Sequence, residues 1–398
     1  MKNTIPFILI LLVGLSCSSK PIATIALTVI EDNRKFSLVT LKEDLGLQKE
    51  QNYHLVDISS GKMIPLEVRD NMELIFLVRD LEKGTHYFEV REGKYQSSAK
   101  AKIEKQDEGY QFYVNDKPVL FYQEKTTLPQ DVSEEYYQRS GFIHPLYSPS
   151  GQVLTDDFPE GHTHQHAIFN AWVNTRFKGE KVDFWNQHQE TGTVAHVDIL
   201  GVHEGDASAT LSTLLSQISL EHGEVLSENW EITLYPFEEF FLFDLFFEQE
   251  NTSEDTLYIL DYHYGGMAFR GSKEWNDADT EHFSNTWSIN TSEGHDNESA
   301  NHTPAKWVTA YGNIDGEEAG LTVFSFPDNF RHPQKIRVHP TMPYWVYAPM
   351  VDGEFVIAPG EKYRGRYRYY VHQGAGNEEV IQSILDDLEK PLEVSVQH

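Results

Sequence analysis

Hydrophobic and polar residues alternate over short runs in the first part of the chain, and turn-forming pairs such as Ser60-Gly61 and Lys83-Gly84 separate the runs. A period of two is typical of strands that bury one face. Six such runs in close succession predict a small sandwich. The expected strands span residues 22–30, 35–41, 53–58, 63–69, 73–79 and 86–91.

A charged stretch at residues 99–108 interrupts this pattern, and we interpret it as a domain boundary. Longer alternating runs follow it at residues 209–218, 225–234, 240–249, 257–264 and 361–371. The clearest helical pattern begins at Asn377, a good N-cap, and places an apolar stripe on residues 380–388. We therefore predict an all-β chain with a small N-terminal β-sandwich (17–105), then a large antiparallel β-sandwich with a C-terminal helix (106–391).

The N-terminal segment has the pattern of an export signal. Lys2 precedes an apolar run, Ile5–Leu15, that is too short to span a bilayer, and Cys17 follows it as the single cysteine. A small residue before a lone cysteine resembles the bacterial lipoprotein processing site. We expect residues 1–16 to be a signal peptide and Cys17 to be lipidated, which would place the protein in the periplasm or outer membrane. An ordinary signal peptide is the alternative.

Charge and missing motifs exclude several functions. The chain of 398 residues has a formal charge of −30, so a nucleic-acid partner is excluded, and a membrane partner is expected only through the lipid anchor. No glycine-rich phosphate loop, dinucleotide fingerprint or nucleophile elbow occurs. Aromatic residues make up 13% of the chain, which favours strands and surfaces that stack on sugars.

Three histidines at alternate positions, His162, His164 and His166, form the main candidate site. On a strand they would share one face, where imidazoles can transfer protons or bind a divalent metal. A divalent metal bound by His162, His164 and His166 is the one cofactor that this cluster suggests. The competing interpretation is a solvated histidine turn near an edge strand.

A second candidate follows a strand end at His263-Tyr264-Gly265-Gly266, where paired glycines would let a ligand approach the backbone. His263 and Tyr264 could act as an acid–base pair, and Arg270 could bind an anion. A structural glycine turn beside a core histidine would give the same sequence.

A row of basic residues alternates along the last long strand. Arg364, Arg366 and Arg368 would share a face with Tyr370 and His372. Guanidinium groups bind carboxylates in bidentate pairs, so this face could hold an acidic sugar. A solvent-exposed row neutralised by nearby acids is the alternative.

Several of these motifs together resemble the bacterial PmoA-like family. The resemblance rests on His144–Gly151, Phe158–Phe169, Asp183–Trp185, His263–Gly266 and Tyr367–His372. It implies an exported β-sandwich protein of the kind encoded among polysaccharide-degradation genes, and nothing in the chain indicates a membrane methane oxygenase.

One motif departs from the family pattern. Many members have His-Pro-His-His-Arg-Gly where this chain has His162-Thr163-His164-Gln165-His166-Ala167. His162 and His164 therefore carry over directly, and the role of the family's arginine does not. In the same motifs, Tyr147 and Trp185 are candidate substrate-binding residues.

These observations favour a lyase or dehydratase acting on uronic-acid-containing oligosaccharides, for example from an algal polyuronate such as ulvan. Proton abstraction at C5 and elimination at C4 need a base, an acid and a cation, which His164, His166, His263, Tyr264 and the arginines could supply. A sugar-binding surface lipoprotein without turnover and a sugar epimerase or mutarotase are the alternatives.

Overall fold

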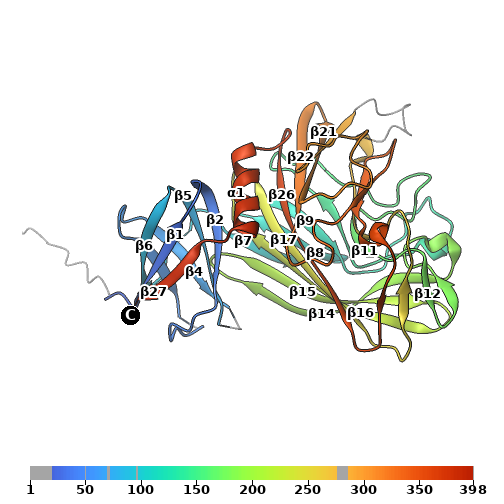
Figure 1. Cartoon of the computed structure of the whole chain (residues 1–398), viewed down its shortest axis with the longest axis horizontal. Helices are drawn as coiled ribbons and strands as arrows, with labels where there is room; N and C mark the ends of the chain where they lie inside the picture. The colour runs from blue at the N-terminus through green and yellow to red at the C-terminus, as the bar shows by residue number, and fades with distance from the viewer. Residues whose placement is uncertain (1–19, 50, 70–71, 96, 276–285, 398) are drawn as a thin grey trace, which may run out of the picture.

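The computed structural model describes residues 20–49, 51–69, 72–95, 97–275 and 286–397 (Figure 1). In this part of the chain the strands form four antiparallel sheets and are accompanied by one α-helix, so the predicted all-β fold with a C-terminal helix is confirmed. None of the described helices has the length and apolar character needed to cross a bilayer. The signal peptide and Cys17 lie outside the described residues, so export and lipidation stay predictions.

The first sheet has seven strands and matches the predicted small sandwich. Residues 63–66 of β4 pair with β3, and residues 67–68 pair with β5, so the sheet folds over a core that includes Leu55, Phe76 and Val90. The strand order is β2 (Arg34–Leu41), β5 (Leu74–Leu81), β4 (Met63–Val68), β3 (Tyr53–Asp57), β6 (Gly84–Glu92), β1 (Ala23–Val29) and β27 (Glu393–Gln397).

The first domain is discontinuous in sequence, which the alternation pattern did not predict. Strand β27 returns after the helix and pairs with β1, from Thr24 opposite Gln397 to Thr28 opposite Glu393. The domain boundary also differs from the predicted one at Lys105, because residues 101–105 pair with β8 in the second sheet.

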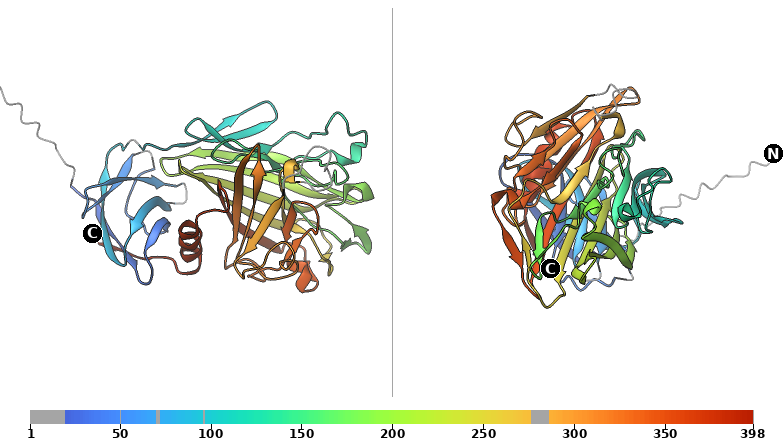
Figure 2. Two further views of the ribbon diagram at one scale, coloured as in Figure 1. Left: turned by 90° about the horizontal axis from the view of Figure 1, so that it is seen from above. Right: turned by 90° about the vertical axis from the view of Figure 1, so that its right-hand side faces the viewer.

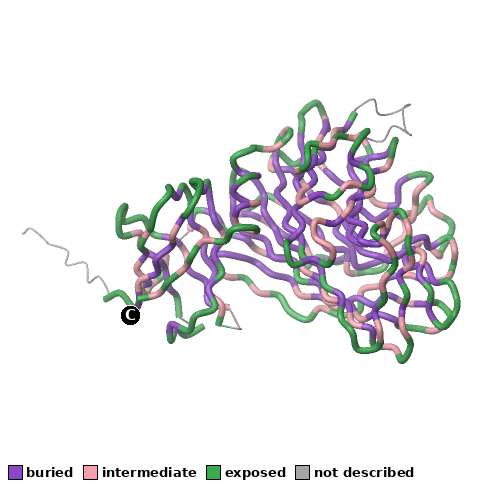
Figure 3. The backbone as a smooth tube through the Cα atoms, viewed as in Figure 1, coloured by how far each residue is buried: buried purple, intermediate pink, exposed green. Residues whose placement is uncertain are grey.

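Two eight-stranded sheets enclose the main core, which contains five fully buried tryptophans and aromatic residues of both sheets. The second sheet runs β23 (Ile336–Val338), β24 (Tyr344–Tyr347), β19 (Gly266–Arg270), β11 (Ile168–Ala171), β10 (Phe142–Leu146), β9 (Lys117–Gln123), β8 (Gly109–Val114) and β7 (Ala101–Lys105). The other runs β14 (Gly192–Glu204), β15 (Ala209–Ser219), β16 (Gly223–Tyr235), β17 (Phe241–Asn251), β26 (Lys362–Gln373), β22 (Glu317–Ser325), β21 (Trp307–Ile314) and β20 (Trp287–Thr291). Figure 3 shows the buried backbone concentrated along these strands.

A smaller four-stranded sheet extends the second domain. Its order is β13 (Glu180–Val182), β12 (Thr175–Phe177), β18 (Leu257–Ile259) and β25 (Phe355–Ile357). The turn after β13 and the segment after β18 both lead toward the candidate site described below.

The helix α1 (Glu378–Glu389) lies between the two domains (Figure 2). As predicted, Asn377 caps it, since its Oδ1 accepts hydrogen bonds from the backbone N–H groups of Glu379 and Val380. Its apolar face packs on residues of the first sheet and on β26 in a separate hydrophobic cluster. Asp387 also accepts hydrogen bonds from the Ser37 hydroxyl and the Leu38 N–H, which attach the helix to β2.

Candidate functional site

A cavity of about 390 Å³ brings together four segments that are distant in sequence. They are the loop before β11, the turn after β13, the segment before β19, and strand β23 with the loop that leads to β24. We call this cavity the histidine pocket. It is lined by His162, His164, Gln165, Trp185, Asn186, His188, Gln189, Tyr262, His263, Tyr264, Arg337, His339 and Tyr344.

The lining has an unusual chemical composition for this protein. It contains five imidazoles, three phenols, one indole, one guanidinium and three side-chain amides. None of these lining residues carries a carboxylate, although the chain has 62 acidic residues and a formal charge of −30. The pocket is therefore a place where a negatively charged ligand meets no acidic wall.

The loop that supplies the first histidines is a series of turns, so the predicted shared strand face is wrong. Backbone hydrogen bonds from His162 N–H to Pro159 and from Gln165 N–H to His162 close two consecutive turns, and Gly161 at φ 75° allows the first. As a result His162 and His164 line the pocket while His166 points into the core.

His166 is fully buried and is not part of the pocket. The rings of Phe142, Phe158 and Phe169 surround its imidazole, with centroids 4.6 to 5.6 Å away. Its Nε2 lies 2.8 Å from Gln187 Oε1. The proposed catalytic and metal-binding roles of His166 are therefore corrected to a structural one.

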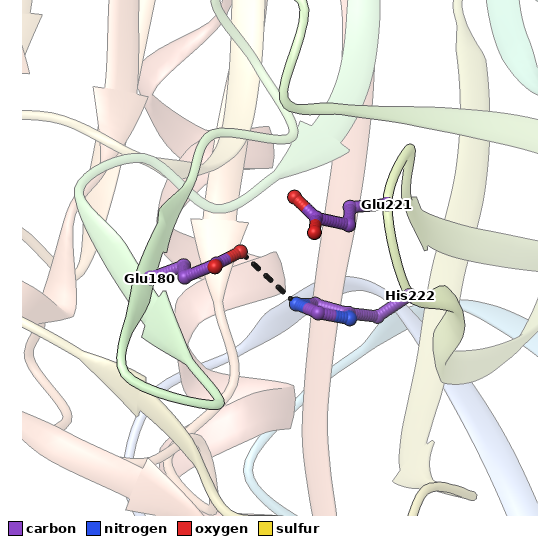
Figure 4. A group of neighbouring side chains, drawn as sticks. All are labelled: Glu180, Glu221 and His222. Atoms are coloured by element: carbon purple, nitrogen blue, oxygen red, sulfur yellow. Dashed lines mark hydrogen bonds and ion pairs between the residues drawn. The ribbon is translucent and has the colours of Figure 1, made fainter.

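The predicted three-histidine metal set does not converge, because His166 faces away from the other two. Elsewhere in the described residues, one group places potential ligand atoms within 4.8 Å of one another: Glu180, Glu221 and His222 (Figure 4). Glu180 Oε2 lies 3.1 Å from His222 Nε2. Both glutamates are exposed and none of the three residues lines the histidine pocket, so this group marks no candidate active site.

His263 and Tyr264 reach the pocket as predicted, and the following glycines explain how. Gly265 and Gly266 have φ angles of 132° and 113°, which disfavour any other residue. A Cβ on Gly266 would lie 2.6 Å from the carbonyl oxygen of Tyr347, so the chain can pass this close to β24 only with glycine.

Trp185 and Asn186 both contact Tyr264 and hold it in place. The Tyr264 ring packs edge-on against Trp185 with centroids 5.3 Å apart, and its hydroxyl donates a hydrogen bond of 3.0 Å to Asn186 Oδ1. Asp183, which is buried, accepts hydrogen bonds from the Asn186 N–H and side-chain amide at 2.8 and 2.9 Å. This chain of contacts fixes the position of the Tyr264 phenol.

Burial favours the neutral form of four pocket imidazoles and the protonated form of the Tyr264 and Tyr344 phenols, because it shifts their pKa values. It lowers the pKa of His164 to about 3 and that of His339 to about 4, with smaller contributions from neighbouring histidines and arginines. The pKa values of His162 and His263 are lowered for the same reason. Burial raises the pKa of Tyr264. Neutral imidazoles can accept a proton, and protonated phenols can donate one.

His339, His188, Tyr344 and Arg337 are pocket residues that the sequence analysis did not select. His339 Nδ1 accepts hydrogen bonds from the backbone N–H groups of Thr341 and Met342, at 3.3 and 3.2 Å, which places the proton of the neutral ring on Nε2. The sequence pattern could have identified Arg337, because an arginine between the apolar residues Ile336 and Val338 on a strand faces away from the core.

Arg270, predicted to bind an anion, lies behind the pocket wall and is fully buried. Its Nη1 donates a hydrogen bond of 3.0 Å to Gln165 Oε1, and its Nη2 lies 4.0 Å from Asp156 Oδ2. Burial raises the pKa of Asp156 to about 6. Arg270 therefore supports the loop at Gln165 and does not line the pocket.

The arginine row on β26 is also separate from the pocket. Arg368 forms two hydrogen bonds to Asp244, at 2.7 and 2.8 Å, and Arg364 Nε lies 2.5 Å from Glu248. Arg366 stacks over Phe326, with its guanidinium 4.2 Å from the ring centroid. The predicted substrate-binding role of these three arginines is replaced by cross-strand pairing and stacking.

Tyr147 lies in a different cavity of about 680 Å³ beside His144. There, His144 Nε2 is 3.1 Å from Asp157 Oδ1 and its Nδ1 is 3.0 Å from Thr155 Oγ1. Both ring nitrogens of His144 are therefore held within the protein. The histidine pocket retains His162, His164, His263, Tyr264 and Trp185 from the predicted set.

Comparisons with solved structures return only partial likenesses. The GH36 α-galactosidase AgaA from Geobacillus stearothermophilus is 13% identical with a TM-score of 0.33, covering 69% of this chain and 41% of its own. An α-mannosidase from Enterococcus faecalis V583 is 11% identical with a TM-score of 0.42, covering 94% and 46%. The heparan sulfate lyase HepC from Pedobacter heparinus is 9% identical with a TM-score of 0.33, covering 72% and 38%. The chain thus spans less than half the length of each of these proteins.

No curated protein matches the sequence. The resemblance to the PmoA-like family stays a prediction. Residues 110–386, which include every residue of the histidine pocket, match the family described as "Family of unknown function (DUF6807)". The chain belongs to this family.

Proposed function

We propose that this protein is a carbohydrate-active lyase or dehydratase that acts on uronic-acid-containing oligosaccharides. The observation that carries the proposal is the lining of the histidine pocket, which combines imidazoles, phenols and a guanidinium with no carboxylate. A cavity of about 390 Å³ falls within the roughly 300–1,000 Å³ typical of small-ligand sites. Hydrolases that use two carboxylates need an acidic pair, and this lining does not supply one.

The proposed reaction is an elimination at the uronate ring. A base removes the proton from C5, the electron pair forms the C4=C5 double bond, and the C4–O bond breaks. The leaving oxygen takes a proton from an acid and departs as water or as the hydroxyl of a neighbouring sugar. The product is a 4,5-unsaturated uronate.

His263 and Tyr264 are the acid–base pair in this proposal. His263 is exposed at the pocket, so its imidazole can take up the C5 proton and release it to solvent. Burial raises the pKa of Tyr264, so its phenol stays protonated at neutral pH and can protonate the leaving oxygen. The two rings are adjacent, with centroids 4.8 Å apart. In the free protein Asn186 orients the phenol hydrogen.

Neutral imidazoles deeper in the pocket would stabilise the charge that develops on the substrate carboxylate. His164 and His339, with pKa values near 3 and 4, stay uncharged at neutral pH and can donate hydrogen bonds. Of these two histidines, His164 belongs to the catalytic set predicted from the sequence.

The test is to incubate the protein with uronate-containing oligosaccharides, such as those from ulvan, and to follow the ultraviolet absorbance of the unsaturated product. His263→Ala and Tyr264→Phe should each lower the rate by roughly 10²–10⁴-fold, with unchanged circular dichroism. His86→Ala and Tyr258→Phe are matched controls, because His86 lies in the first domain and Tyr258 is exposed on β18. Product mass distinguishes loss of water from loss of a sugar.

Two outcomes would overturn the elimination. Saturable sugar binding without new absorbance would assign the pocket to a non-catalytic sugar-binding protein. A change of sugar configuration without an unsaturated product would assign it to an epimerase or mutarotase.

A further inference from the structure

Arg337 is the one guanidinium among the residues that line the histidine pocket, and the fold places it there through strand alternation. It is the central residue of the three-residue strand β23, between the buried residues Ile336 and Val338. Its side chain therefore leaves the opposite face of the strand from its neighbours. It is only half-buried and lies on the pocket wall with His263 and His339.

The hydrogen bonds of Arg337 fix one edge of the guanidinium and leave the other edge available. Nη1 donates to Asn301 Oδ1 at 3.0 Å and to the carbonyl oxygen of Val338 at 2.8 Å. Asn301 is itself held, because its Oδ1 also accepts from the Val338 N–H at 3.2 Å. Neither Nε nor Nη2 donates to any of the described residues, and none of their carboxylates lies within ion-pair distance of Arg337.

This arrangement differs from that of the other arginines considered above. Arg364 and Arg368 are paired with acids on β17, and Arg270 is fully buried. The open Nε–Nη2 edge of Arg337 has the geometry that a carboxylate binds with two parallel hydrogen bonds. Its charge also contributes to the lowered pKa values of His263 and His339, second to burial. It is thus close enough to interact with two imidazoles of the pocket.

We propose that Arg337 is the residue that selects an acidic sugar, by binding its carboxylate at the Nε–Nη2 edge while Asn301 holds Nη1. This inference rests on the proposed function, since it assigns the acid-recognising residue of that same pocket. It makes Arg337 a specificity-determining residue, and it gives Asn301 a positioning role through Arg337.

The experiment measures binding without requiring turnover. Isothermal titration calorimetry compares D-glucuronate with its methyl ester, in which a methyl group on one acid oxygen removes the negative charge. The full-length protein should bind glucuronate at least tenfold more tightly than the ester. Arg337→Gln should weaken glucuronate binding by roughly 10- to 100-fold and leave ester binding unchanged. Arg337→Lys should retain part of the preference, because it keeps the charge without the fork.

Arg364→Gln is the matched control, because it removes an arginine that is paired with Glu248 outside the pocket, and it should leave both affinities unchanged. Asn301→Ala should reduce the preference for glucuronate by a smaller factor than Arg337→Gln. Thermal melting checks the fold of each variant. If Arg337→Gln does not fold, the lysine and Asn301 variants provide the same comparison.

Equal weakening of acid and ester by the Arg337 variants, an unchanged preference in them, or no preference in the unaltered protein would each overturn the proposal. The outcome is separable from that of the proposed function. A preference for glucuronate that depends on Arg337, without formation of an unsaturated product, would refute the elimination and keep this inference.

Discussion

The histidine pocket and the arginine row on β26 are two clusters of basic side chains in the same acidic protein, and they have opposite surroundings. The pocket is lined by imidazoles and one guanidinium without an acid. On β26, Arg364 and Arg368 stand directly opposite Glu248 and Asp244 of β17 in the antiparallel register. Two of the three arginines in the row are paired with acids of the protein and the third stacks on Phe326, whereas the pocket leaves its basic groups for a ligand.

The difference lies in what covers each face. Tyr370 and His372 share the face of the arginine row, and α1 with the loop before it packs over them. A Cβ on Gly376 would lie 2.9 Å from His372 Nε2, so the cover is tight. The pocket is bounded by loop ends that meet from four segments and leave a cavity. A cluster of basic residues in the sequence therefore does not by itself indicate a binding site. The fold decides whether these residues are covered and paired within the protein or left open to a ligand.

The largest effect that separates the two regions is expected at Asp244. Asp244→Ala would leave the buried Arg368 guanidinium without its partner, and should lower the free energy of unfolding by about 3–5 kcal/mol. Urea denaturation measures this change. The matched control is Glu248→Ala, on the same strand and face. Because its partner Arg364 is exposed, this variant should lower the free energy of unfolding by only about 0–1 kcal/mol. Similar losses in both variants would show that the arginine row is not differentially buried.

Acid pH should destabilise the folded protein through His164 in the pocket. His164 has a pKa of about 3 in the folded protein and about 6.5 when unfolded, so between these values the unfolded state binds more protons. The contribution of neutral His164 to the free energy of unfolding is complete above about pH 6.5 and is lost as the pH falls toward 3. Asp156 and Asp157 act in the opposite direction, because burial raises their pKa values to about 6.

A variant isolates the contribution of His164. Between pH 7 and pH 5, the unaltered protein should lose on the order of 1–2 kcal/mol more than His164→Asn. Urea titrations at the two pH values measure the difference. His86→Asn, which replaces a half-buried histidine of the first domain, should behave like the unaltered protein. Equal pH dependence of His164→Asn and the unaltered protein would contradict a half-buried His164 that is neutral in the folded state.

The smallest effect is expected at the exposed end of the arginine row. Arg364→Gln should change the free energy of unfolding by less than about 1 kcal/mol and the catalytic rate by less than about twofold. Its guanidinium is largely exposed, is bound to Glu248 and does not line the pocket. A large loss of turnover in this variant would indicate that the arginine row contacts the substrate after all.

Local patterns in the sequence predicted the strands and the helix, but not how they meet. The period-two alternation around Phe76 and the capping of α1 by Asn377 are set by neighbours along the chain. The pairing of Asp244 with Arg368 depends on the register between strands that are more than a hundred residues apart. No pattern within either strand specifies that register.

The candidate site was predicted in part for the same reason. The motif residues His162, His164, His263 and Tyr264 do meet in one pocket. The prediction for His166 was wrong because this segment forms turns and not the expected strand. In a turn, successive side chains do not alternate between two faces. His339 and Arg337 came from a segment without a recognised motif, and only the pairing of β23 with β24 brings them to the pocket.

The pairing of β27 with β1 has a consequence for the order of folding during synthesis. Residues 23–29 leave the ribosome early, but the strand that covers their open edge is made only after the whole second domain and α1. Until then β1 exposes unpaired backbone groups that can pair with other chains. The nascent protein is thus most vulnerable to aggregation at the domain that is made first and completed last.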